Sequence, residues 1–181
     1  MLSLNLNNLS SEDKKKLFKE LKTGDCIELS GVIYTARDAA HKRIMSMIEN
    51  NEDLPFDLSD ALIYYAGPTP AKNGLPIGSC GPTTSSRMDI FTPELIKRGL
   101  IATIGKGERS KEVVNACHEF SSVYFCAIGG AGALAAKCIT ECKVIAFDDL
   151  GCESVKKLIF KNFPLTVAID TYGNDLFKRS E

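Results

Sequence analysis

The sequence lacks an excess of charge of either sign. Its 181 residues include 22 Lys and Arg against 23 Asp and Glu, which gives a formal net charge of −1. Proteins that hold nucleic acid through its phosphates carry a basic surface, whereas the short basic run Lys14–Lys16 lies among acidic residues. We therefore expect no nucleic-acid partner.

Long apolar segments are also missing. The longest uncharged stretch, Phe120–Ala136, is interrupted by glycines and is shorter than the roughly 20 apolar residues that a membrane helix needs. The first residues, Met1–Asn8, have neither the basic start nor the continuous apolar run of a secretory signal. We expect no membrane span and a cytoplasmic location.

Histidine is scarce, and the cysteines are odd in number. The chain has two histidines and seven cysteines, most of which lie in apolar surroundings, as reduced, buried thiols usually do. Two reactive alternatives stay open. Cys80, in a glycine-rich loop, could be a nucleophile with His41, and a metal could bind Cys138, Cys142 and Cys152, although their spacing fits no zinc or cluster signature.

What the sequence does contain is an alternation of short apolar runs with helical patterns. With 44% hydrophobic and 25% charged residues, it is an ordinary globular chain, and the alternation predicts an α/β domain of layered sheet and helices. The expected strands are 61–66, 100–104, 123–128, 144–147 and 165–169, and 26–35 is expected as a strand or a bent hairpin. The expected helices begin at Ser10 or Ser11, at Arg37 and at Thr92, or cover 110–119, 132–141 and 153–160. We divide the chain into a helical arm, residues 1–23, and one domain, residues 24–181.

The loop Thr35–His41 turns an expected strand into an expected helix. Arg37 and His41 are one helical turn apart and therefore share a face. An arginine at a helix N-terminus opposes the helix macrodipole, which favours an acid there. An anion between the guanidinium and the helix N-terminus would relieve this repulsion, so Arg37 is a candidate anion-binding residue.

Two further loops carry similar chemistry. Gly78–Asp89 combines glycines that allow close backbone approach, four consecutive hydroxyl residues and Arg87, which can bind a carboxylate through two parallel hydrogen bonds. Gly105–Gly107 places Lys106 between two glycines directly after an expected strand. Together with Arg37, these loops predict a pocket rich in fixed cations and hydrogen-bond donors.

A dinucleotide site is the sharpest alternative from another class. Gly130–Ala135 fits the pattern G-x-G-x-x-A after an apolar strand, and Asp148 and Asp149 follow at about the 20-residue distance of a ribose-binding acid. The pattern comes late in the series of strands rather than at the first turn. We therefore favour close helix–strand packing over an oxidoreductase domain that binds NAD.

The three loops together resemble the β-subunit of class I (iron–sulfur) fumarate hydratase, a family that includes L(+)-tartrate dehydratase. The resemblance is carried by Gly81–Asp89, reading GPTTSSRMD, with Thr35–His41 upstream and Gly105–Gly107 downstream. It covers approximately Gly24–Phe177. The one departure is Ser85-Ser86, where the family often has Ala-Gly.

The resemblance implies a fold and a partner. The fold would be the swivelling β/β/α domain, so that residues 24–181 form one domain of the β-subunit type. The catalytic [4Fe–4S] cluster would be held by three cysteines of a separate α-subunit and not by this chain, on which no metal ligand is expected. The family pairs two α/β units, which implies a fumarate hydratase α-subunit as partner and an α2β2 heterotetramer.

The resemblance also implies reversible hydration of fumarate to malate in a site shared with the α-subunit. That reaction passes through an aci-carboxylate with extra negative charge, which fixed cations stabilise. The residues expected to bind the dicarboxylate are Arg37, Thr83, Arg87 and Lys106. Those expected to act in catalysis are Thr83, Arg87 and Lys106, and those expected to support them are His41, Thr84 and Asp89. L(+)-tartrate or a related dicarboxylate as substrate, and a non-catalytic dicarboxylate-binding module, stay open as alternatives.

Overall fold

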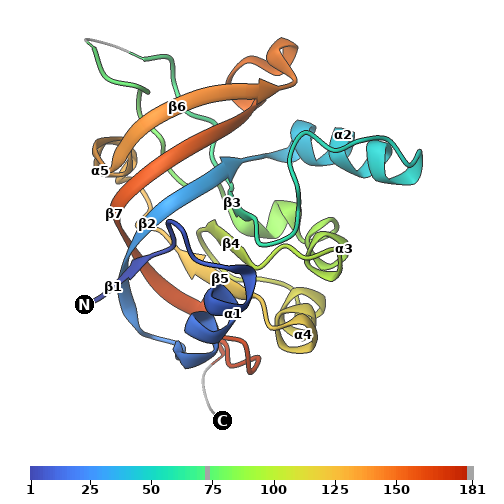
Figure 1. Cartoon of the computed structure of the whole chain (residues 1–181), viewed down its shortest axis with the longest axis vertical. Coiled ribbons are helices and arrows are strands. Elements are labelled where there is room, and N and C mark those ends of the chain that lie inside the picture. The colour runs from blue at the N-terminus through green and yellow to red at the C-terminus, as the bar shows by residue number, and fades with distance from the viewer. Residues whose placement is uncertain (72–73, 179–181) are drawn as a thin grey trace.

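The computed structural model describes residues 1–71 and 74–178, so the expected domain end at residue 181 lies outside the described residues. The strands are β1 (Leu2–Asn5), β2 (Cys26–Thr35), β3 (Leu62–Tyr64), β4 (Ala102–Gly105), β5 (Val123–Cys126), β6 (Ile139–Ala146) and β7 (Val155–Ile169). The helices are α1 (Ser11–Glu20), α2 (Asp38–Glu49), α3 (Thr92–Lys97), α4 (Lys111–Phe120) and α5 (Gly132–Lys137), with short 3-10 turns η1 (Ser85–Met88) and η2 (Asp148–Glu153). This mixture, seen in Figure 1, confirms the α/β class.

Five of the strands close into a small barrel. Strands β2, β3, β4 and β5 run parallel in that order, and the long strand β7 pairs antiparallel with both β5 and β2. Strand β1 extends the sheet beside β2, and β6 extends it beside β7. The bend in β2 coincides with a bulge between Leu29 and Gly31. At Gly31, φ is 152°, which residues with a side chain rarely adopt, and a Cβ would come within 3.1 Å of Leu6 Cβ, so glycine suits this close approach.

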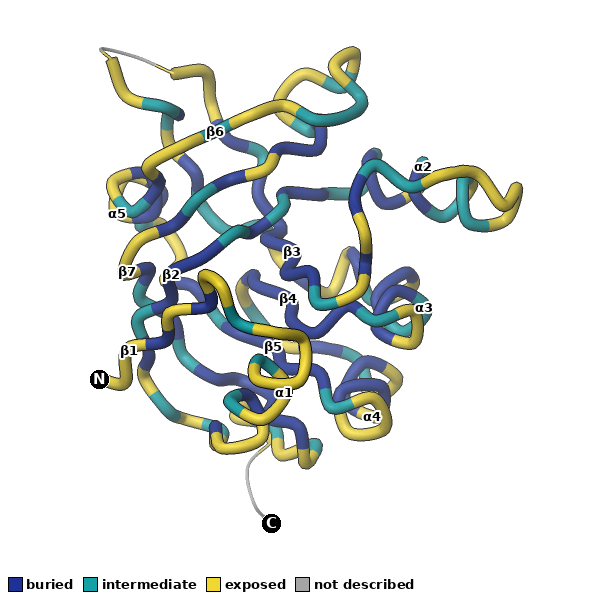
Figure 2. The backbone as a smooth tube through the Cα atoms, viewed as in Figure 1, coloured by how far each residue is buried: buried dark blue, intermediate teal, exposed yellow. Residues whose placement is uncertain are grey.

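Apolar side chains cover both faces of the curved sheet. Successive residues of a strand point to opposite faces, so Leu62 and Tyr64 join one apolar cluster whereas Ile63 joins the other. The second cluster includes Ile44 and Leu95 of helices α2 and α3, which lie with α4 on one side of the sheet (Figure 1). Figure 2 shows the buried residues concentrated along the strands. None of the helices in the described part of the chain has the length and apolar character needed to cross a bilayer.

The first 23 residues contain a strand as well as the expected helix. Helix α1 begins where the sequence predicts, because the Ser10 hydroxyl accepts a hydrogen bond from the Asp13 amide. Strand β1, which the sequence analysis missed, pairs in parallel with β2. Leu4, Phe18 and Leu21 are buried in the same apolar cluster as the sheet. This segment therefore packs on the body of the protein.

Two expected helices are wrong in extent or type. The expected helix 132–141 ends at Lys137, and its last residues belong to β6. The expected helix 153–160 is instead the first half of β7, apart from its first residues. The apolar residues Val155, Leu158 and Ile159 fit a helical spacing, but β2 and β6 flank this segment and take its backbone hydrogen bonds. Tertiary pairing therefore decides its conformation.

The parallel order of β2, β3, β4 and β5 places their carboxyl ends at one edge of the sheet. The loop after β2 carries Arg37, the long segment after β3 carries Gly81–Asp89, and the loop after β4 carries Lys106. The loop 127–131 follows β5 at the same edge. Ligands of α/β proteins usually bind at this edge, and all three motif loops lie there.

Candidate functional site

Backbone hydrogen bonds join the motif loops directly. Thr84 pairs with Lys106 as an isolated parallel bridge, and the Ser85 amide donates to the Lys106 carbonyl over 2.9 Å. The Thr83 amide donates to the carbonyl of Tyr65, just after β3, over 2.6 Å. The segment Gly81–Asp89 is thus fixed between the ends of β3 and β4, which brings Thr83 and Lys106 to one place.

Arg37 is the N-cap residue of helix α2, as expected, and its guanidinium lies against the chain after β3. A Cβ on Gly67 would come within 2.5 Å of Arg37 Nη1, so the absence of a side chain at Gly67 makes room for the guanidinium. Arg37 Nη2 lies 3.4 Å from Oε1 of Glu153, and Glu153 Oε2 accepts a hydrogen bond of 3.0 Å from the Ala39 amide. The anion between Arg37 and the helix N-terminus is therefore Glu153, which sequence analysis did not single out.

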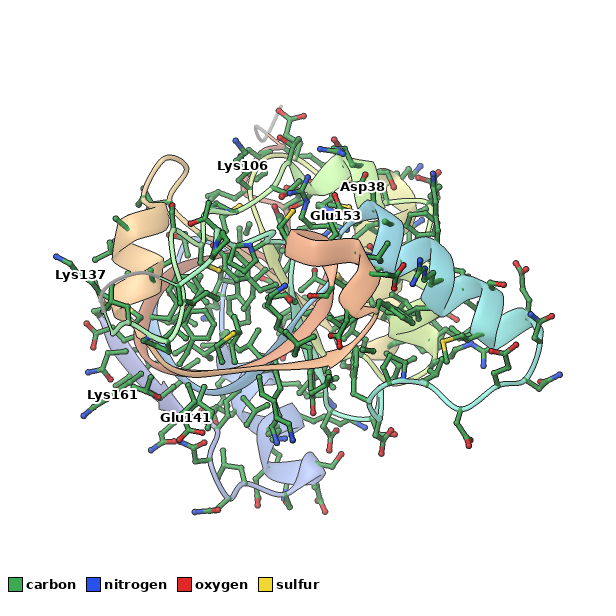
Figure 3. All side chains as sticks on the ribbon, turned by 90° about the horizontal axis from the view of Figure 1, so that it is seen from above. Asp38, Lys106, Lys137, Glu141, Glu153 and Lys161 are labelled. Atoms are coloured by element: carbon green, nitrogen blue, oxygen red, sulfur yellow. The ribbon has the colours of Figure 1, made fainter. Side chains whose placement is uncertain are left out.

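Arg87 lies at the same helix N-terminus. Its Nε and Nη2 bind the two carboxylate oxygens of Asp38 at 3.0 and 2.8 Å, a two-pronged ion pair. Since Asp38 follows Arg37 in the chain and Glu153 accepts from the Ala39 amide, both arginines have their carboxylate partners at the N-terminus of α2. Figure 3 shows Asp38, Glu153 and Lys106 at the same side of the molecule. The structure thus brings together the three expected cationic residues.

Lys106 and Thr83 keep their polar groups available. The Lys106 side chain is exposed, and no carboxylate in the described part of the chain forms an ion pair with it. A Cβ on Gly129 would lie 3.7 Å from Lys106 Cδ, so the loop after β5 borders this side chain. Thr83 is half-buried, and its hydroxyl forms no hydrogen bond with any described residue. Thr84 is exposed beside it.

Asp89 supports the site through a residue that sequence analysis missed. The Asp89 carboxylate accepts hydrogen bonds from Arg109 Nε at 2.7 Å and from the Ser110 amide at 2.6 Å. Arg109 is buried and also donates to the hydroxyls of Thr103 and Thr92. Asp89 therefore does not face a ligand but anchors the end of the motif loop. A lone arginine after the lysine loop gave no signal that could have identified this network.

His41 lies beneath the site rather than in it. The side chain is buried between the rings of Tyr65 and Phe91, and Nδ1 lies 2.9 Å from the carbonyl of Arg37. Burial lowers the pKa of His41 to about 4. A neutral ring can donate from Nδ1 to that carbonyl, so His41 supports the backbone of Arg37.

The depressed pKa of His41 predicts a pH-dependent stability. Below its ordinary pKa of 6.5 the unfolded chain binds a proton at this residue, whereas the native chain does not until about pH 4. The free energy of unfolding should therefore fall as the pH drops through this window, by about 3 kcal/mol from this group alone. Urea titrations across this range should show a weaker pH dependence for His41→Phe than for the wild type. The exposed His118→Gln should follow the wild type, and parallel curves for His41→Phe and the wild type would refute the assignment.

The glycine pattern after β5 serves packing. A Cβ on Gly132 would come within 2.9 Å of the Gly81 amide, and the Cys80 amide donates to the Gly132 carbonyl over 3.0 Å. Helix α5 has only six residues, and the strand that follows it pairs antiparallel with β7. A dinucleotide motif instead needs a parallel strand after its helix. This segment thus holds the motif loop in place.

The cysteines do not form the reactive sites considered as alternatives. Burial raises the pKa of the Cys80 thiol to about 12, so Cys80 is a protonated core thiol and a poor nucleophile. Cys142 lies in β6, and Cys138 directly follows α5. Within residues 1–71 and 74–178, no group of three or more His, Cys, Asp or Glu side chains is arranged to hold a metal ion.

Comparisons with known proteins agree with the family resemblance that the motif loops carry. The family model described as fumarase C-terminus matches residues 2–180. A provisionally named L(+)-tartrate dehydratase subunit beta from Methanocaldococcus jannaschii is 42% identical over 178 residues, covering 95% of this chain and 89% of that protein. Mitochondrial fumarate hydratase 1 of Leishmania major is 38% identical over 97% of this chain and 32% of its own length.

A bacterial relative is likewise much longer than the part of it that this chain matches. The anaerobic class I fumarate hydratase of Escherichia coli is 37% identical over 84% of this chain and 28% of its own length. The chain thus spans about a third of the length of the fumarate hydratases that it matches. Since the family model covers nearly the whole sequence, this chain belongs to the fumarase C-terminus family, together with class I fumarate hydratases and an L(+)-tartrate dehydratase β-subunit.

Proposed function

We propose that this chain is the β-subunit of an iron–sulfur hydro-lyase that reversibly hydrates fumarate to malate, in an active site shared with an α-subunit. The observation that carries the proposal is the convergence of Arg37, Arg87 and Lys106 at one sheet edge. A planar dicarboxylate presents two negative groups, and three cations from separate loops suit both of them.

The reaction requires fixed positive charge, which this edge of the sheet carries. When water adds to fumarate or leaves malate, negative charge builds up on the carboxylate next to the reacting carbon, and cations held in place stabilise that charge without reorganising. Arg37 and Arg87 can each bind a carboxylate through two hydrogen bonds, and Lys106 adds a compact charge. Thr83, whose hydroxyl has no described protein partner, would lie beside the reacting carbon.

The expected [4Fe–4S] cluster does not fit the cysteines of this chain. A cluster needs several thiolates close together, whereas Cys80 and Cys117 are separate core thiols whose pKa burial raises to about 12. No group of three candidate ligands occurs among the described residues. The cluster would accordingly belong to the α-subunit, and two α/β pairs would form an α2β2 complex.

Three finer assignments belong to this proposal. The fold would be the swivelling β/β/α domain, which is supported by the α/β architecture. The complex would be cytoplasmic, a reducing compartment that suits seven free cysteines. L(+)-tartrate dehydration is the second candidate reaction, favoured by the 42% identity to a relative of nearly the same extent.

The proposal predicts that the isolated chain is inactive and that activity appears on anaerobic assembly with an α-subunit. The measurement is co-purification of the two chains followed by hydration and dehydration assays with fumarate, malate, L-tartrate and a methylated homologue. Turnover by the complex but not by either chain alone supports the proposal, and the preferred substrate decides between the two reactions. A complex that binds dicarboxylates without turnover would instead indicate a non-catalytic binding module.

A further inference from the structure

The buried side chain of Lys156, near the start of β7, has no role in the site described so far. Only 8% of the residue is exposed. Its Nζ donates to the carbonyls of Gly151, Cys152 and Ser154 at 3.1, 3.2 and 3.3 Å, and to the Ser154 hydroxyl at 2.7 Å. No carboxylate pairs with this ammonium in the part of the chain that the structure describes. All hydrogen bonds of the ammonium thus go to one turn, residues 151–154.

That turn carries Glu153, the carboxylate beside Arg37. Gly151 has φ of 57° and ψ of −113°, a break in the 3-10 turn, and the carbonyls on either side of Glu153 both bind Lys156. Carbonyl groups that converge on one point repel each other unless a cation lies between them. The ammonium therefore stabilises the backbone conformation that directs Glu153 to helix α2.

A second contact links Lys156 to the strand that leads into Arg37. The Lys156 amide donates to the Thr35 hydroxyl over 3.1 Å, and that hydroxyl lies 3.4 Å from the Ser154 carbonyl. Thr35 is the last residue of β2, two positions before Arg37. The turn, the end of β2 and the start of α2 are thus joined at Lys156.

We propose that Lys156 is a positioning residue for the dicarboxylate site: it fixes the turn 151–154, so that Glu153 holds the guanidinium of Arg37 in its binding orientation. The inference rests on the proposed function for the role of Arg37 but not for the contacts themselves. If the buried ammonium only stabilised the fold, the effect of removing it would not depend on Glu153. The tests therefore ask whether the effect of replacing Lys156 on Arg37 depends on the presence of Glu153.

The first test uses the isolated chain and requires no enzymatic activity. Phenylglyoxal modifies arginines, and mass spectrometry gives the rate at each site. In Lys156→Met, Arg37 should react roughly two- to fivefold faster, the factor expected when a partly exposed ion pair is lost, whereas the exposed Arg98 should be unchanged. Glu153→Gln should give the same increase, and adding Lys156→Met to it should give no more.

The second test uses the assembled complex. Lys156→Met should lower kcat/KM for the dicarboxylate roughly 10- to 100-fold, the cost of a misplaced binding group, and should have little further effect in Glu153→Gln. Lys157→Met is the matched control, because Lys157 is exposed on the same strand. Ser154→Ala, which removes one acceptor of Lys156, should produce the same changes at smaller size and replaces Lys156→Met if that variant does not fold.

The outcomes separate this inference from the proposed function. An increased rate at Arg37 in the isolated Lys156→Met chain, together with a wild-type complex that turns over no dicarboxylate, supports the positioning role and contradicts the proposed function. An unchanged rate at Arg37 in a folded Lys156→Met or Ser154→Ala chain overturns the positioning role, whatever the activity. Additive losses of kcat/KM in the double variant also overturn it, because they would show that Lys156 acts independently of Glu153.

Discussion

Replacing Arg109 by methionine is expected to lower the free energy of unfolding by about 3 to 5 kcal/mol, the usual cost of removing one partner of a buried ion pair. The Arg109 side chain is fully buried, and Asp89 is about 10% exposed. The guanidinium also lies over the rings of Tyr65 and Tyr124, 5.3 and 4.7 Å from their centroids. Methionine can fill much of the volume, but it leaves the Asp89 carboxylate with the Ser110 amide alone.

Urea denaturation of the isolated chain measures this loss. The matched control is Arg98→Met, since Arg98 forms an exposed ion pair with Glu94 one helical turn away, and such pairs contribute less than about 1 kcal/mol. Adding Asp89→Asn to Arg109→Met should recover part of the loss, because it removes the unpaired buried charge. Equal stability of Arg109→Met and Arg98→Met would show that the buried ion pair contributes no more to the free energy of unfolding than the exposed one.

The sequence predicts the loops of the candidate site better than their supports. Glycines, hydroxyls and a cation in a short segment form a local signal, so the loops with Arg37, Arg87 and Lys106 can be recognised one by one. Their meeting follows from the parallel order of β2, β3 and β4. Glu153 and Arg109, in contrast, act through partners far away in the chain, and no local pattern marks a lone acid or arginine as such a partner.

The fold shows the same division between local and long-range information. Helix α1 and helix α4 begin where Ser10 and Ser110 cap them, since a cap is a contact within one turn. The segment Val155–Phe160 fits both a helix and a strand by its apolar spacing. Only the pairing with β2 on one side and β6 on the other makes it a strand.

If the chain acts as proposed, Arg87→Ala should lower kcat/KM of the assembled complex roughly 100-fold or more, because a cation would be lost where negative charge develops in the reaction. The ion pair with Asp38 uses Nε and Nη2 of Arg87, so Nη1 stays available for a substrate carboxylate. The chain should stay folded, since the Arg87 side chain is 51% exposed. Steady-state kinetics with fumarate and malate, beside thermal melting of the same preparation, make the measurement.

A second variant separates charge from geometry at this position, and a variant at another arginine is its control. Arg87→Lys keeps the charge but loses the planar fork, so an intermediate loss of roughly tenfold is expected. Arg98→Ala removes an exposed, ion-paired arginine elsewhere and should leave activity unchanged. If Arg87 only binds substrate, the loss appears mainly in KM; if it stabilises the developing aci-carboxylate, the loss appears in kcat. Full activity of Arg87→Ala would remove Arg87 from the active site, and with it the two-arginine arrangement around Asp38.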